Sequence, residues 1–185
     1  MKIKNLNPRN KKKRWEVVKQ LAEWHAKNKF LKDQISKLEK FKDFPIFSIA
    51  VFILKTELIE YELKQLISLL DAYLWTLEIN FTPVILTRKL RMPNDLDDLT
   101  FGKLAKELNQ YHGEFLKDLQ TTLPQLVSLR NKFIHGLFKP EDLKSLMVEI
   151  EKGLIIVDEV IRNLNDVYKF LENHPPKKLK YKSPD

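Results

Sequence analysis

The chain has 185 residues, enough for one domain with a substantial core, and a net charge of +8 at pH 7. It contains no Cys, which excludes a disulfide framework and a thiolate-held metal site and suits a reducing cytoplasm. The longest apolar run, residues 46–54, is far shorter than the ~20 residues of a membrane span, and residues 1–14 lack the apolar segment of a secretory signal. We therefore expect a cytoplasmic protein that does not enter a membrane.

The positive charge is concentrated at the two ends of the chain. Residues 1–14 hold seven basic side chains and no acidic one, and residues 177–185 hold four Lys and one Asp. We expect a basic N-terminal tail (residues 1–13), one helical domain (14–174) and a basic C-terminal tail (175–185). The basic ends, in particular Lys11, Lys12, Lys13 and Arg14, could hold a polyanion by counterion release, or they could be solubilising segments.

Two long helices are predicted first. Apolar residues recur every three or four positions over residues 14–41 and again over 45–77, and Pro45 is suited to a helix start. The first half of the second helix is apolar on several faces, which favours central burial. Its Glu57, Glu60 and Glu62 have no E-x-x-H partner, so a di-iron bundle is disfavoured.

The helical periodicity stops over residues 78–99, where a basic cluster of Arg88, Lys89 and Arg91 occurs. A loop of this length is usually functional or mobile, so the cluster either contacts a nucleic-acid backbone or is a solvated surface. A short helix is expected over residues 100–111, with Thr100 as one candidate for its cap.

Two more helices complete the chain. One is expected from Thr122 and Pro124 to His135, with Gly136 as its C-terminal cap. The last should begin at Pro140, and its apolar residues alternate spacings of four and three as in a heptad seam. The fold class predicted is therefore all-α, a bundle of about five helices with a long C-terminal helix. The seam residues are Leu143, Met147, Ile150, Leu154, Val157, Ile161, Leu164, Tyr168 and Leu171.

The fourth of these helices carries an unusual polar combination, Arg130, Asn131 and His135, within an apolar frame. Asn131 and His135 are i and i+4 neighbours on a helix, and the long Arg130 side chain can reach the same rim. A guanidinium is a forked donor suited to phosphate, and an imidazole transfers protons near neutral pH. Together the three groups suit phosphodiester chemistry without a metal. The alternative is that His135 caps or packs at a helix end and that Arg130 is a solvated charge.

This segment resembles the R-x4-6-H motif of the HEPN superfamily, and Asn131 matches the polar residue that often follows the Arg. The motif also falls late in an all-helical chain, before a long last helix. The resemblance implies a metal-independent endoribonuclease without cofactor, in which the RNA 2′-hydroxyl attacks the adjacent phosphate. His135 would be general base or acid, Arg130 would stabilise the phosphorane, and Asn131 would orient His135 or the phosphate. RNA would then be the partner of the basic residues at 11–14 and 88–91.

Family members of this kind serve as toxins, antiphage effectors or RNA-processing enzymes, so an antitoxin or defence-system partner is a further implication. The toxin subgroup paired with a nucleotidyltransferase carries a Tyr two residues after the His, where this chain has Leu137, so that subgroup is not supported. Catalytic members typically pair with their motifs at the interface, so we expect a homodimer that supplies two copies of His135. A non-catalytic module that binds RNA, nucleotides or a partner protein, and a plain helical scaffold, remain the alternatives.

Overall fold

The computed structural model describes residues 8–41, 45–79, 87–88, 96, 99–136 and 143–175; within these ranges, the side chains of 8–21, 45, 75–79, 87–88, 135–136 and 143–145 lie outside the description. The described residues form five α-helices, which confirms the all-α class. They are α1 (Pro8–Leu38), α2 (Pro45–Ile79), α3 (Phe101–Leu108), α4 (Lys117–Gly136) and α5 (Leu143–Asn173). No helix in these ranges is both long enough and apolar enough to span a membrane.

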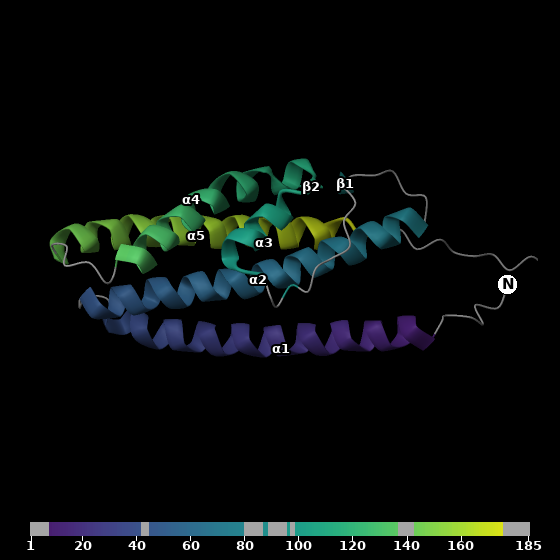
Figure 1. Ribbon diagram of the computed structural model, residues 1–185, viewed down its shortest axis with the longest axis horizontal. Coiled ribbons are helices and arrows are strands. Elements are labelled where there is room, and N and C mark those ends of the chain that lie inside the picture. Colours follow the sequence, from purple (N-terminus) through teal and green to yellow (C-terminus); the bar gives the residue numbers. More distant parts are fainter. Residues whose placement is uncertain are drawn as a thin grey trace, which may run out of the picture.

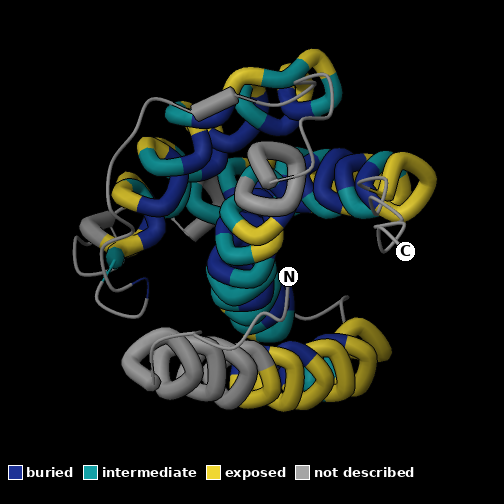
Figure 2. The backbone as a smooth tube through the Cα atoms, turned by 90° about the vertical axis from the view of Figure 1, so that its right-hand side faces the viewer, coloured by how far each residue is buried: buried dark blue, intermediate teal, exposed yellow. Residues whose placement is uncertain are grey.

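Helix α2 lies in the middle of the bundle (Figure 1). Helix α1 packs against one side of α2, and α3 and α5 pack against it elsewhere, while α4 lies over α3 and α5. Seen along the bundle, α1 forms a layer of its own below α2, with most of its described surface exposed (Figure 2). This arrangement places α4, with the Arg130 segment, in the layer opposite α1.

The core follows the apolar periodicity of α2 and α5. Side chains of α2 that step by three and four are fully buried, as the sequence predicts for a central helix. On α5 every second residue of the predicted seam, from Ile150 onward, is buried, and the residues between them are partly buried against the same core. The buried residues of these two faces include Ile59, Leu63, Leu66, Ile67 and Leu70 of α2, and Ile150, Val157, Val160, Leu164 and Leu171 of α5. A smaller cluster, Leu31, Ile35, Val51 and Leu58, joins α1 to α2.

The start of α4 differs from the prediction. The helix begins at Lys117, directly after a 3-10 turn (η3, Glu114–Leu116), and Pro124 lies inside it. Proline has no N–H to donate to the preceding turn and therefore indicates a helix start. Buried residues at helical spacing nevertheless continue through it, so tertiary packing outweighs the local penalty. They are Leu116, Leu119, Leu123 and Leu126.

Other boundaries shift for similar reasons. Helix α1 begins at Pro8 rather than near residue 14, so the basic residues 11–14 lie within the helix. A 3-10 turn, η1 (Glu39–Phe41), follows α1. Thr100 precedes α3 as expected but makes no side-chain cap hydrogen bond. The predicted start of the last helix at Pro140 lies outside the described residues.

A two-residue strand pair interrupts the predicted loop. Strand β1 (Thr87–Arg88) pairs antiparallel with β2 (Tyr111–His112), with Arg88 opposite Tyr111. Tyr111 is fully buried and donates a 2.6 Å hydrogen bond to Asp71 of α2. The Gln120 amide of α4 donates to the carbonyl of Tyr111 at 2.8 Å, so β2 is fixed to both helices.

Candidate functional site

Helix α4 carries all three residues of the predicted site near its C-terminal end. Asn131 is exposed, whereas Phe133 is buried and meets Phe52 of α2 edge to face, with 5.3 Å between ring centroids. The helix is therefore fixed on one side and open on the other, as the sequence predicts for this segment. His135 lies in the last turn of α4, and its side chain is outside the described residues.

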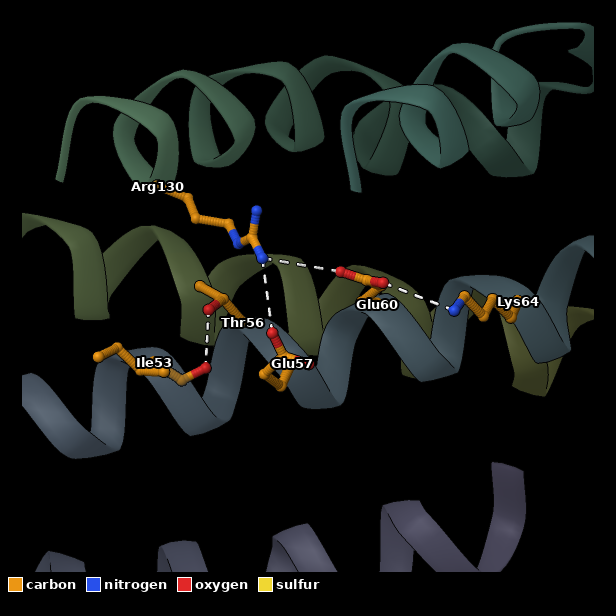
Figure 3. A network of polar contacts seen from close by, with 6 residues as sticks. All are labelled: Ile53, Thr56, Glu57, Glu60, Lys64 and Arg130. Carbon is orange, nitrogen blue, oxygen red and sulfur yellow. Dashed lines mark hydrogen bonds and ion pairs between the residues drawn. The ribbon is translucent and has the colours of Figure 1, made fainter. Parts of the chain in front are cut away.

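The Arg130 side chain points from α4 toward α2 (Figure 3). Its Nη2 lies 3.5 Å from Glu57 Oε1, to which it donates a hydrogen bond, and 3.8 Å from Glu60 Oε2. Its Cζ lies 5.5 Å from the centre of the Phe101 ring of α3, a cation–π contact. With 20% of its side chain exposed, Arg130 is not the freely solvated charge of the alternative interpretation.

Glu60 is held from a second direction by Lys64, one turn further along α2. Lys64 Nζ lies 3.5 Å from Glu60 Oε1, and Lys64 is buried. Burial, followed by repulsion from Glu57, raises the pKa of the Glu60 carboxyl, although Lys64 and Arg130 oppose this shift. Since the folded-state pKa is raised, ionised Glu60 costs stability above that pKa, and the cost is relieved as the pH falls through it.

Among the described side chains, the charges around Arg130 therefore balance. Glu57 and Glu60 face Arg130 and Lys64, so the described residues that contact Arg130 do not form a basic cleft. Both ion pairs of Arg130 use Nη2 and are longer than the 2.7–2.9 Å of tight charge-assisted bonds. A guanidinium has five N–H donors, so a phosphate could be bound through the rest of the fork.

Gly153 of α5 allows α2, α4 and α5 to approach closely beneath this site. A Cβ at position 153 would lie 2.7 Å from Phe52 Cε2 and 2.8 Å from Leu129 Cδ2. Leu129 directly precedes Arg130, so the absence of a side chain at Gly153 helps to set the position of the Arg130 backbone. Sequence reasoning missed this glycine, because a helical Gly gives no local signal of what packs on it.

Sequence reasoning also missed Glu57 and Glu60 as partners of Arg130, having considered them only as metal ligands. Their three-residue spacing places them on one face of α2, which is visible in the sequence, but nothing local indicates that α4 covers that face. Among the described side chains, no group of three or more His, Asp or Glu could hold a metal ion.

The predicted RNA-binding residues are placed only in part. Arg88 belongs to β1, and residues 11–14 belong to α1, but their side chains lie outside the description, as do Lys89 and Arg91 altogether. The predicted contact of these cations with RNA stays a prediction.

A hollow of about 450 Å³ lies at the opposite end of α4 from His135, lined by His112, Gly113, Glu114, Lys117 and Gln120. At ~1.5 Å per residue, Lys117 is roughly 20 Å along the helix from Arg130, so the hollow is separate from the motif.

Comparisons of the chain with protein-family models, with curated proteins and with solved structures found no match. Function is therefore inferred from α4 and the side chains around it.

Proposed function

We propose that the protein is a metal-independent endoribonuclease of the HEPN type, with Arg130, Asn131 and His135 as its catalytic residues. The observation that carries the proposal is the setting of Arg130. Ion pairs fix its guanidinium near the C-terminal end of α4, and the next residue of that helix, Asn131, is exposed. His135 follows one turn later on the same helix. A toxin, an antiphage effector and an RNA-processing enzyme are the biological roles that fit such an activity.

The reaction is a transphosphorylation within RNA. The 2′-hydroxyl loses its proton and its oxygen attacks the adjacent phosphorus, and the bond from phosphorus to the 5′-oxygen of the next nucleotide breaks. The leaving oxygen takes up a proton, so the products are a 2′,3′-cyclic phosphate and a 5′-hydroxyl. His135 transfers a proton, and Arg130 stabilises the charge on the phosphoryl oxygens. Asn131, an i and i+4 neighbour of His135, orients the imidazole or the phosphate.

A homodimer would supply the second proton-transfer group. One chain offers one His135, whereas the reaction needs one proton removed and another delivered. A two-fold axis beside the C-terminal end of α4 would bring two copies together. Exposed apolar side chains occur near this end of α4. Ile134 lies on α4 itself, and Val148 of α5 precedes Glu149, which pairs with Lys132 of α4; such contact would bury both apolar side chains.

The ion pairs of Arg130 also favour a second candidate. In a non-catalytic HEPN-like module that binds RNA, nucleotides or a partner protein, Arg130 would stay bound to Glu57 and Glu60 and serve only to join α4 to α2. Such a module needs no exposed guanidinium donors and no proton transfer by His135.

Cleavage of labelled RNA in the presence of EDTA separates the two candidates. The wild type should cleave and leave cyclic phosphate ends, and His135→Ala and Arg130→Ala should each abolish cleavage while keeping the helical circular-dichroism signal. Asn131→Ala should lower the rate less, because water can replace an orienting amide in part. Matched controls are His25→Ala on the exposed side of α1 and Arg162→Ala, an exposed arginine of α5, which should cleave like the wild type.

Each contrary outcome has a definite meaning. Full activity in His135→Ala or Arg130→Ala rejects the proposed site. Loss of activity in EDTA that a divalent ion restores rejects the mechanism. RNA binding without cleavage by the wild type supports the non-catalytic module.

A further inference from the structure

The arginine of α4 is held by two acidic side chains of another helix. We infer that Glu60 and Glu57 of α2 are positioning residues for Arg130, which fix its guanidinium where it meets the RNA phosphate. This inference rests on the proposed function, and it adds two residues to the site that the R-x4-6-H spacing does not contain.

The geometry fixes the guanidinium from two helices. Glu57 and Glu60 are one turn apart on the same face of α2, and both reach Nη2 of Arg130, at 3.5 and 3.8 Å. The Phe101 ring of α3 lies against the same group, 5.5 Å from Cζ (Figure 3 shows the polar contacts). Because both carboxylates contact Nη2, the other nitrogens of the fork do not belong to these ion pairs.

Glu60 is itself fixed, through Lys64. The Lys64 ammonium contacts Glu60 at 3.5 Å, and its side chain is only 6% exposed, so Lys64–Glu60–Arg130 is a continuous polar connection from the interior to α4. Glu57 is more exposed than Glu60, 39% against 17% of the side chain. Glu57 is the nearer of the two and accepts the hydrogen bond, but water screens its charge more strongly, so we expect the larger positioning effect from Glu60 and the smaller one from Glu57.

A contribution to stability does not by itself explain why a carboxylate is held at position 60. Burial raises the pKa of its carboxyl despite two cationic neighbours, so the folded protein holds the ionised form at a cost. Groups held in this way concentrate at functional sites. An arginine side chain has considerable rotamer freedom, and a displacement of ~1 Å in a catalytic group can lower a rate by up to about 100-fold. Restraint of Arg130 is therefore of direct use to the reaction.

Steady-state cleavage by Glu60→Gln and Glu57→Gln tests the inference, because Gln keeps the shape and removes the charge. A displacement of ~1 Å can lower a rate by up to about 100-fold, and Gln keeps the shape of Glu. We therefore expect Glu60→Gln to lower kcat by about tenfold and to change KM less than about twofold. Glu57→Gln should lower kcat less. The matched control is Glu62→Gln, on the same helix with 16% of its side chain exposed but paired with Lys32 instead. It should leave kcat and KM unchanged.

The melting temperature is measured in parallel, so that a loss of activity is not confused with unfolding. Glu60→Gln should show the lower kcat while its melting temperature stays within a few degrees of that of the wild type. If Glu60→Gln fails to fold, Glu57→Gln, at the more exposed position, becomes the decisive variant, and it should likewise lower kcat more than it changes KM. Unchanged or raised kcat in the decisive variant overturns the inference, even where wild-type cleavage confirms the proposed function.

A thermal double-mutant cycle does not depend on cleavage. Arg130→Ala should lower the melting temperature less in the Glu60→Gln background than in the wild type, because the pair is already broken there. Equal losses in both backgrounds mean that Glu60 does not hold Arg130, and they overturn the inference. If the wild type cleaves no RNA, the proposed function fails, and this cycle still decides whether Glu60 restrains Arg130.

Discussion

Replacing Gly153 by Ala should destabilise the bundle through a steric clash beneath the Arg130 site. The added Cβ would lie 2.7 and 3.2 Å from two atoms of the Phe52 ring and 2.8 Å from a methyl group of Leu129. Leu129 can move its methyl, but Phe52 is 1% exposed and is packed edge to face against Phe133. Because the Phe52 ring is buried against Phe133 of α4, we expect it to yield less easily than the Leu129 methyl group.

The magnitude follows from two opposing effects. Overpacking a core costs about 1–3 kcal/mol, whereas Ala in place of Gly within a helix contributes about 1 kcal/mol of stability. Because the nearest neighbour is a fixed ring, we expect a net loss of about 1–2 kcal/mol, the upper half of the resulting range. For a chain of this size that corresponds to a melting temperature lower by roughly 2–8 °C.

Gly102 provides the matched control, since it is also helical but has space for a methyl group. A Cβ there would meet Val127 Cγ1 at 3.5 Å, an ordinary van der Waals contact. Gly102→Ala should therefore stabilise the protein by up to about 0.5–1 kcal/mol. Urea unfolding followed by circular dichroism measures both variants. If Gly153→Ala is as stable as Gly102→Ala, the close packing of α5 against Phe52 and Leu129 is not as described.

Three further predictions address RNA, association and the core. Replacing the four basic residues at 11–14 by Gln, which retains α1, should weaken RNA binding. The slope of the logarithm of the binding constant against the logarithm of the salt concentration should become shallower by up to about 0.7 for each phosphate that is no longer neutralised. An unchanged slope would make them solubilising residues. Specific activity measured alongside sedimentation should fall as a homodimer dissociates on dilution, and a monomer that still cleaves RNA would refute the composite site. Tyr168→Phe should cost about 0.5–1.5 kcal/mol, because the Tyr168 hydroxyl donates to the Glu62 carbonyl at 3.1 Å; an unfolding free energy equal to that of the wild type would show that this bond is not significant.

The sequence by itself determined the five described helical segments, although not all of their ends, and the apolar faces that the long helices bury. The alternating three- and four-residue steps of α5 predicted the inward positions of Ile150, Val157 and Leu164, all of which are buried. The several apolar faces of α2 likewise predicted its central place. These features are local, because the helical period and the pattern of apolar residues along it are properties of a single segment.

Only the tertiary structure decided what each polar residue meets. Arg130 and Glu57 are 73 residues apart in the chain, and no spacing rule relates them. The helical position of Pro124 was also a tertiary outcome, because burial of the neighbouring leucines outweighs the local cost of the proline. Local patterns specify the face that a helix turns inward, but the partner on that face depends on how separate helices pack, and Gly153, without a side chain, sets how closely they do so.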